Sequence, residues 1–221
     1  MNKNGRSTVE AVVFDCDGLL LDTEKCWTKG EAAVFAAHGM ALTPEHKRNL
    51  VGASGKRAST YICEVLGIPG REDEVLEELI ALSWPEVVNG ANPMPGAEEL
   101  VKELHGNFPI GVASNSPGGM VREALAKSGL GGAFDVVLGS DDVASPKPAP
   151  DLYRTACERR GAEPKFSVAL EDSPPGVAAA RAAGMYVIGV PSEPGVELDA
   201  DLVVESLEDP SVLEAARTKE R

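Results

Sequence analysis

Cysteine is scarce in this sequence and shows no disulfide or metal-binding spacing. The chain contains four cysteines, Cys16, Cys26, Cys63 and Cys157, which are far apart and form no C-x-x-C pair. Disulfide frameworks and structural zinc sites usually have closely spaced cysteines. The pattern therefore argues against both classes and favours reduced thiols in a cytoplasmic protein.

Positive charge is also in short supply. Lysine and arginine number 21 against 35 aspartates and glutamates, which leaves a formal net charge of -14. Such a charge repels the phosphates of nucleic acids and the anionic surface of membranes, so we expect neither as a partner. The same repulsion acts on a small phosphorylated substrate. Phosphate chemistry on this chain therefore requires local cations.

Long hydrophobic runs are missing near the N-terminus. The apolar run at residues 11–14 stops at Asp15, which makes it too short for a signal sequence or a membrane span. Hydrophobic residues make up 43% and charged residues 25% of the 221 residues, as in ordinary soluble domains. The length suffices for one domain with a small insertion.

Short apolar runs bounded by turn residues predict buried parallel strands. They are Val9–Phe14, Ile110–Ala113, Val136–Leu138, Ser167–Leu170, Tyr186–Val190 and Leu202–Val204. Helical patterns separate the later runs, at Ala97–Leu104, Gly119–Ser128, Asp151–Arg160 and Gly176–Ala183. Because strands alternate with helices, we predict an α/β fold with a doubly wound parallel sheet.

The segment after the first strand breaks this alternation. It contains no strand candidate, and apolar residues such as Trp27, Ala33, Val34 and Ala37 recur at helical spacing. We predict four or five inserted helices, after which the Pro/Gly-rich turn Asn89–Gly96 returns the chain to the sheet. The predicted units are an α/β core of residues 1–20 and 89–221 and an α-helical cap of residues 21–88. A helical insertion on such a core is a candidate lid.

Two pairs of carboxylates follow predicted strands. Asp15 and Asp17 come directly after the first strand, and Glu171 and Asp172 follow the strand Ser167–Leu170. The carboxyl ends of parallel strands are where α/β sheets bind ligands, and carboxylates suit Mg²⁺. The alternatives are a plain strand-ending turn for the first pair and capping of the next helix for the second.

Two further segments offer groups that could bind phosphate. The strand Ile110–Ala113 runs into Ser114 and Asn115 before a helix, which places a hydroxyl and backbone N–H groups at a helix N-terminus; simple capping is the alternative. Lys147 lies between prolines just before another helix. We interpret it as a fixed counter-charge to the acids.

The order of these motifs resembles that of the haloacid dehalogenase superfamily. The chain carries D-x-D-G at Asp15, S-N at Ser114, K-P at Lys147 and E-D at Glu171, and the resemblance covers nearly its whole length. The helical insertion after the first motif is similar to that of the subgroup with an α-helical cap. That subgroup includes β-phosphoglucomutase-like enzymes and sugar-phosphate phosphatases.

The resemblance implies a role for each motif residue. Asp15 is expected to be the nucleophile that forms an aspartyl-phosphate, and Asp17 the acid and base that serves the leaving oxygen and then water. Asp15, the backbone carbonyl of Asp17 and Asp172 are expected to hold Mg²⁺, with Glu171 in support. An aspartate at position 17 also favours phosphate-ester hydrolysis over dehalogenation.

The expected phosphate ligands are Ser114, the backbone amide of Asn115 and Lys147. By the same resemblance, the segment from Gly52 to Arg57 helps to select the substrate, through Lys56 or Arg57. A solvated helix start is an equally good interpretation of these two residues.

These observations favour a Mg²⁺-dependent phosphatase of a small phosphorylated metabolite, acting as a monomer or weak homodimer. One alternative is a sugar phosphomutase. Its relatives carry an arginine soon after the Gly-x-Ser of the cap segment, where this chain has Gly55. The other is a receiver-type signalling domain, which would leave the helical insertion unexplained.

Overall fold

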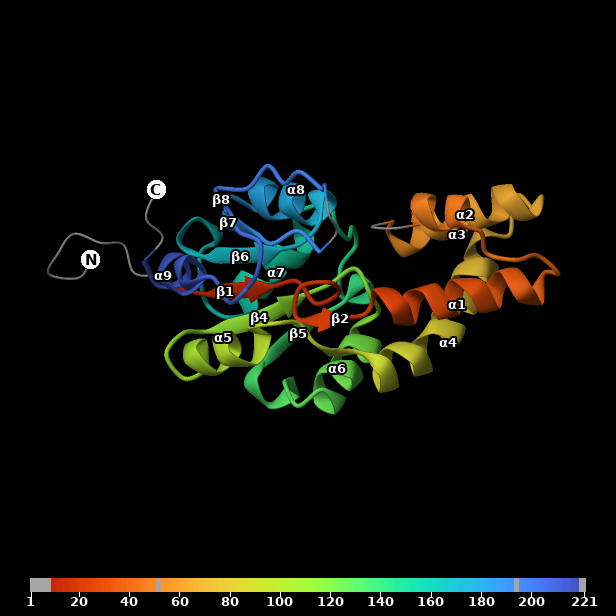
Figure 1. The fold of residues 1–221 in the computed structure, drawn as a ribbon. Coiled ribbons are helices and arrows are strands. Elements are labelled where there is room, and N and C mark those ends of the chain that lie inside the picture. Colours follow the sequence, from red (N-terminus) through yellow and green to blue (C-terminus); the bar gives the residue numbers. More distant parts are fainter. Residues whose placement is uncertain (1–8, 51–52, 193–194, 219–221) are drawn as a thin grey trace, which may run out of the picture. The chain divides into compact units, whose positions relative to one another are not determined.

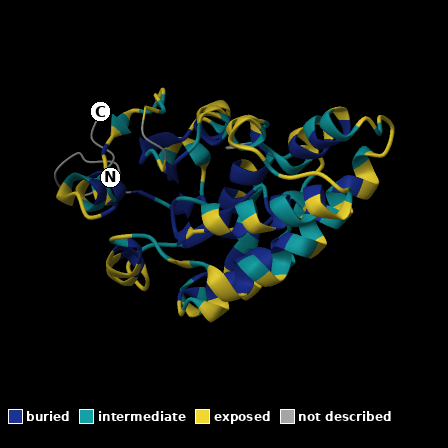
Figure 2. Cartoon of the chain, turned by 45° about the vertical axis from the view of Figure 1, so that its right-hand side comes forward, coloured by how far each residue is buried: buried dark blue, intermediate teal, exposed yellow. Residues whose placement is uncertain are grey.

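The computed structural model of the protein describes residues 9–50, 53–192 and 195–218. These residues form two compact units. One contains the described residues up to Asp22 and from Asn92 onward, and the other is Thr23–Ala91. Figure 2 shows that exposed residues fall mainly on helices and loops, whereas the central strands of the larger sheet are buried.

The first unit is built on a parallel sheet (Figure 1). Its strands are β1 (Val12–Phe14), β4 (Ile110–Ala113), β5 (Val136–Leu138), β6 (Val168–Glu171), β7 (Tyr186–Gly189) and β8 (Leu202–Val203). Their order is β5-β4-β1-β6-β7-β8, so the chain winds outward from β1 in both directions. This arrangement confirms the predicted doubly wound sheet. It also places the point at which the winding reverses, where such sheets bind ligands, beside β1.

The helices of this unit follow the prediction, with one addition. They are α5 (Ala97–Leu104), α6 (Gly118–Lys127), α7 (Asp151–Arg159), α8 (Pro174–Ala183) and α9 (Pro210–Thr218). The prediction missed α9 and the short antiparallel pair β2 (Leu21–Asp22) and β3 (Asn92–Pro93). The sequence does contain a helix-start signal for α9, the pair Asp209-Pro210. In the structure Pro210 is the first residue of the helix, and Asp209 accepts a hydrogen bond from the Ser211 backbone N–H at 2.9 Å.

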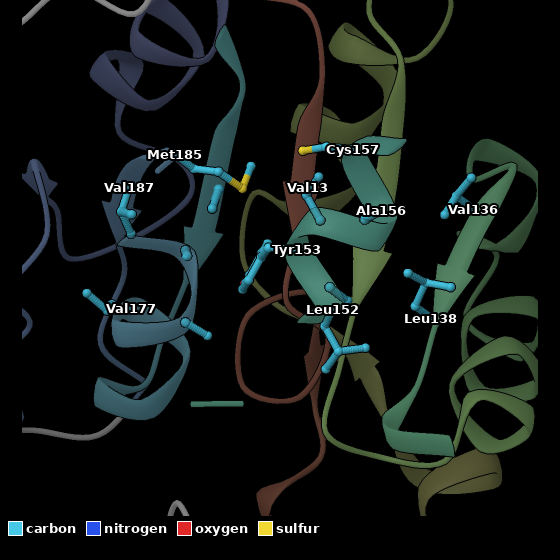
Figure 3. Packing of buried hydrophobic residues seen from close by; sticks show 14 residues of the cluster. Val13, Val136, Leu138, Leu152, Tyr153, Ala156, Cys157, Val177, Met185 and Val187 are labelled. Carbon is cyan, nitrogen blue, oxygen red and sulfur yellow. The ribbon is translucent and has the colours of Figure 1, made fainter. Parts of the chain in front are cut away.

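One face of the sheet packs against α7 and α8 (Figure 3). The sheet residues of this cluster are Val13, Ala113, Val136, Leu138, Ala169 and Val187. Because side chains alternate along a strand, the residues two positions after Val13 and Ala169 continue the same face. Those residues are Asp15 and Glu171.

The second unit consists of helices, as predicted for the cap. Its described residues form α1 (Glu24–Ala37), α2 (Pro44–Leu50), α3 (Gly55–Leu66) and α4 (Glu72–Gly90). Two details of the prediction are wrong. Ala37 is exposed, since the buried face of α1 runs through Gly30, Val34 and Phe35. Helix α4 also continues through the first residues of the predicted turn, because the apolar side chains just before them are buried.

No helix among the described residues is long and apolar enough to cross a membrane. The four cysteines are buried thiols.

The contact between α1 and α4 requires a glycine at position 30. A Cβ atom there would lie 1.9 Å from Ser83 Oγ and 2.8 Å from Ser83 Cβ. We expect Gly30→Ala to lower the free energy of unfolding by about 1–2 kcal/mol, because overpacking outweighs the gain of about 1 kcal/mol in helix propensity. Urea unfolding measures the change.

Ser83→Ala is the matched control. The Ser83 hydroxyl is buried without a hydrogen-bond partner among the described residues. Its removal should leave the stability unchanged or raise it. A Gly30→Ala variant as stable as the wild type would show that α1 and α4 can separate at no cost.

Candidate active site

Three buried carboxylates meet where β1 and β6 end. Phe14 pairs with Leu170 in the register of the two strands, so the next residues, Asp15 and Glu171, are neighbours. The Asp15 backbone N–H donates to the Leu170 carbonyl at 3.0 Å. Asp15, Glu171 and Asp172 each place one oxygen within 4.8 Å of the others. This all-oxygen set fits a hard cation such as Mg²⁺ or Ca²⁺.

Lys147 supplies positive charge to the same cluster. Its Nζ donates to Glu171 Oε1 at 2.6 Å and also to Asp15 Oδ1, and the side chain is buried. Burial alone would lower the pKa of Lys147, but the attraction of Asp15 and Glu171 outweighs it and raises the pKa. The lysine is therefore charged and held in place, as the sequence predicted for a counter-charge.

The side chain of Asn115 fixes the backbone of Lys147. Its Oδ1 accepts the Lys147 backbone N–H at 2.9 Å, and its Nδ2 donates to the Lys147 carbonyl at 3.1 Å. The amide thus connects the segment after β4 to the segment before α7. The predicted contact of Asn115 with phosphate runs through its backbone amide, and it stays a prediction.

The carboxylate of Asp17 turns toward the segment that follows β4. Asp17 Oδ2 accepts hydrogen bonds from the Ser114 hydroxyl at 3.0 Å and the Ser116 hydroxyl at 2.8 Å. Ser114 also accepts the Ser116 backbone N–H at 3.0 Å. The three carboxylates that meet at the strand ends do not include this side chain. The sequence reasoning missed Ser116, although it directly follows the S-N motif.

Asp172 has a hydrogen-bond partner that no sequence motif indicated. The Ser192 hydroxyl donates to Asp172 Oδ2 at 2.6 Å from the segment after β7. Burial, together with the negative charge of Glu171, raises the pKa of Asp172 to about 7. Burial also raises the pKa of Asp15 well above its ordinary value, although Lys147 opposes this shift. A bound cation would lower the pKa of both carboxyl groups.

The predicted substrate-selecting residues lie in the helical unit. Lys56 and Arg57 are exposed in the first turn of α3, and Ser54 Oγ accepts the Arg57 backbone N–H at 3.4 Å. Both side chains are thus exposed at the start of a helix, and their contact with a substrate stays a prediction. Gly52, at the start of this segment, lies outside the described residues.

A separate cavity lies on the core between α6 and β5. Its volume is about 590 Å³, and its lining includes Arg122, Phe134 and Val137. The lining contains none of the carboxylates described above, nor Lys147. The chemistry is therefore concentrated at the strand ends and not in this cavity.

A doubly wound sheet with acids and a lysine at its strand ends is typical of α/β proteins that bind or transfer phosphate. Comparison with family models assigns residues 12–190 to the haloacid dehalogenase-like hydrolases. The chain belongs to this family, as its motifs suggested. This match excludes the alternative that the chain is a receiver-type signalling domain.

Similar proteins include several phosphatases. The chain is 37% identical over 186 residues to a probable pseudouridine-5'-phosphatase of Drosophila melanogaster, covering 81% of this chain and 80% of that protein. It is 31% identical over 179 residues to a fructose-1-phosphate phosphatase of Escherichia coli, covering 81% and 95%. These relatives confirm the expected enzyme class, a phosphoric monoester hydrolase.

The chain spans about half, 56%, of a bifunctional riboflavin kinase/FMN phosphatase of Arabidopsis thaliana, with 31% identity over 215 residues.

Among solved structures, CbbY from Rhodobacter sphaeroides in complex with phosphate superimposes with a TM-score of 0.78 and 29% identity, covering 91% of this chain and 96% of that one. The β-phosphoglucomutase of Clostridium difficile reaches a TM-score of 0.78 at 21% identity, covering 94% and 96%. At that identity the likeness concerns the fold alone.

The raised pKa of Asp172 predicts how stability depends on pH without metal. Between its ordinary value of 3.8 and about 7, the folded carboxyl keeps a proton that the unfolded chain has lost. The free energy of unfolding should therefore fall as the pH rises through this window. Urea unfolding in EDTA between about pH 5 and pH 7 measures the slope.

Asp172→Asn removes this titrating group, so its slope should be shallower than that of the wild type. Groups far from the cluster contribute equally to both slopes, so the difference reports Asp172 together with its effect on the pKa of Asp15. Parallel curves for the two proteins would show that Asp172 titrates normally.

Proposed function

We propose that the protein is a Mg²⁺-dependent phosphatase that hydrolyses a small phosphorylated metabolite through an aspartyl-phosphate on Asp15. The observation that carries this proposal is the environment of Asp15. It is a buried strand-end carboxylate that contacts a buried lysine and lies beside two further acids. A carboxylate can accept a phosphoryl group when nearby cations neutralise the charge of that group.

The reaction has two steps. In the first, an oxygen of Asp15 forms a bond to phosphorus, the bond from phosphorus to the ester oxygen breaks, and Asp17 gives its proton to that oxygen. In the second, water forms a bond to phosphorus, Asp17 takes the proton from water, and the bond to Asp15 breaks. The products are an alcohol and inorganic phosphate, and both aspartates return to their starting states.

The residues that surround Asp15 fit these steps. Lys147 can neutralise phosphoryl oxygens from its fixed position. Ser114 can donate to one of them when its single hydroxyl hydrogen turns away from Asp17, which Ser116 still holds. Ser114 and Ser116 hold Asp17 on the β4 side of Asp15, where the leaving group would be protonated. These roles match the ones that the sequence resemblance implies.

Mg²⁺ is the cation that we propose for the acidic cluster. Asp15, Asp172 and the backbone carbonyl of Asp17 would hold it, and it would supply charge neutralisation to the phosphoryl group. Glu171 would support the site rather than bind the ion, since both of its oxygens already accept hydrogen bonds.

The proposed substrate is a sugar phosphate or a similar small phosphate ester. Relatives that act on pseudouridine-5'-phosphate and on fructose-1-phosphate support this class. Lys56 and Arg57 are the candidate residues for its selection. The alternative function, a sugar phosphomutase, is less well supported. This chain has Gly55 at the position where phosphomutases carry an arginine in the cap.

Phosphate release from a panel of sugar phosphates, nucleotides and phosphoglycolate tests the proposal and distinguishes hydrolysis from isomerisation.

Asp15→Asn should abolish turnover, because an amide is a poor phosphoryl acceptor. We expect kcat to fall at least 100-fold, about 2.7 kcal/mol of transition-state stabilisation. Asp135→Asn makes the same chemical change at an exposed carboxylate that pairs with Arg160, and it should keep wild-type kcat. An Asp15→Asn variant with more than about a tenth of the wild-type kcat would rule out Asp15 as acceptor.

Removal of metal should have the same effect as loss of the acceptor. Excess EDTA should abolish phosphate release, Mg²⁺ should restore it, and Zn²⁺ should substitute poorly in an all-oxygen site. Mg²⁺ should also raise the melting temperature of the wild type more than that of Asp172→Asn. Full activity in EDTA, or equal thermal shifts in the two proteins, would contradict the metal site.

A further inference from the structure

Tyr153 is a polar residue inside the apolar cluster on the α7 face of the sheet. It has no exposed surface, and its neighbours in the cluster include Leu152, Val177 and Val187. Figure 3 shows its side chain leaving α7 toward the side of α8. A buried phenol needs a hydrogen-bond partner, so the partner of this hydroxyl indicates what the residue does.

The Tyr153 hydroxyl donates to Glu171 Oε1. The same oxygen accepts the hydrogen bond from Lys147 Nζ. Lys147 Nζ also lies 5.1 Å from the centroid of the Tyr153 ring, within the range of a cation–π contact. Tyr153 therefore contacts both members of the Lys147–Glu171 ion pair.

The other side of the Glu171 carboxylate is held as well. Its Oε2 accepts the Ser173 hydroxyl at 3.2 Å. A Cβ atom at Gly176 would lie 2.0 Å from both carboxylate oxygens, so the carboxylate packs against the backbone in the first turn of α8. Glu171 is thus immobilised on its Oε2 side, and Tyr153 completes the arrangement on its Oε1 side.

The charges explain why a donor at this position matters. Lys147 has one ammonium group and two carboxylate partners, Asp15 and Glu171. A second donor on Glu171 Oε1 offsets part of its negative charge, so Glu171 competes less strongly for the ammonium. The lysine then stays available to Asp15.

We propose that Tyr153 is a positioning residue for the reaction, acting through Glu171 to hold Lys147 against Asp15. This inference rests on the proposed function, because it concerns the rate of phosphoryl transfer. Without the hydroxyl, Glu171 would draw Lys147 away from the point where the phosphoryl group arrives. The effect should appear in kcat rather than in KM, because Tyr153 is buried in the core and does not contact the substrate.

Tyr153→Phe tests the inference, because it removes the hydroxyl and keeps the ring that packs in the cluster. With a phosphate ester that the wild type hydrolyses, in saturating Mg²⁺ and well below the melting temperature, we expect kcat to fall about five- to tenfold with KM changed less than twofold. Tyr186→Phe is the matched control. It removes a hydroxyl from another buried tyrosine, at the amino end of β7 and so away from the carboxyl ends of the strands, and should keep wild-type kcat.

A double-mutant cycle separates positioning from structural support. In a Glu171→Gln background, Tyr153→Phe should lower kcat no further, because the carboxylate through which it acts is gone. A merely structural hydroxyl would change the melting temperature but leave kcat of the folded enzyme unchanged. An unchanged kcat for Tyr153→Phe, or equal losses in the two backgrounds, would overturn the inference while leaving the proposed function intact. If the wild type and Tyr186→Phe both release no phosphate from any ester, the proposed function fails, and this inference fails with it.

Discussion

The attraction between Lys147 and the carboxylates around it is the interaction on which the rest of the site depends. Among the described residues Lys147 is the only buried basic side chain, and Asp15, Glu171 and Asp172 are buried beside it. Two carboxylates about 4 Å apart repel each other by about 4 kcal/mol at an effective dielectric constant of about 20. One lysine cannot neutralise three such groups. The cluster therefore favours a bound cation, which the proposed reaction needs before a phosphoryl group can approach.

The fold brings these charges together with few segments. The register of β1 and β6 makes Asp15 and Glu171 neighbours, and Asn115 attaches the Lys147 backbone to the end of β4. Helix α7 begins four residues after Lys147, and Tyr153 in its first turn reaches back to Glu171. The segment 147–153 thus contains the ammonium group of Lys147 and the hydroxyl of Tyr153, and both contact Glu171.

The strand ends could be predicted from the sequence because parallel strands of one sheet end at the same edge. Asp15, Ser114 and Glu171 each stand at the end of an apolar run, which was enough to expect them together. Tyr153 and Ser192 could not be found in this way, because their contacts depend on strand order and helix packing. An apolar pattern shows that a residue is buried, not which polar atom it meets. In the helical unit the same limit applies to the contact between Gly30 and Ser83.

Reductive trapping during turnover tests most directly whether Asp15 carries the phosphoryl group. Borohydride reduces an acyl phosphate to an alcohol, which converts a phosphorylated aspartate to homoserine. Peptide mass spectrometry after borohydride treatment in the presence of substrate and Mg²⁺ should find homoserine at position 15, and only when substrate is present. Homoserine at a different aspartate, or none while phosphate is released, would contradict the account.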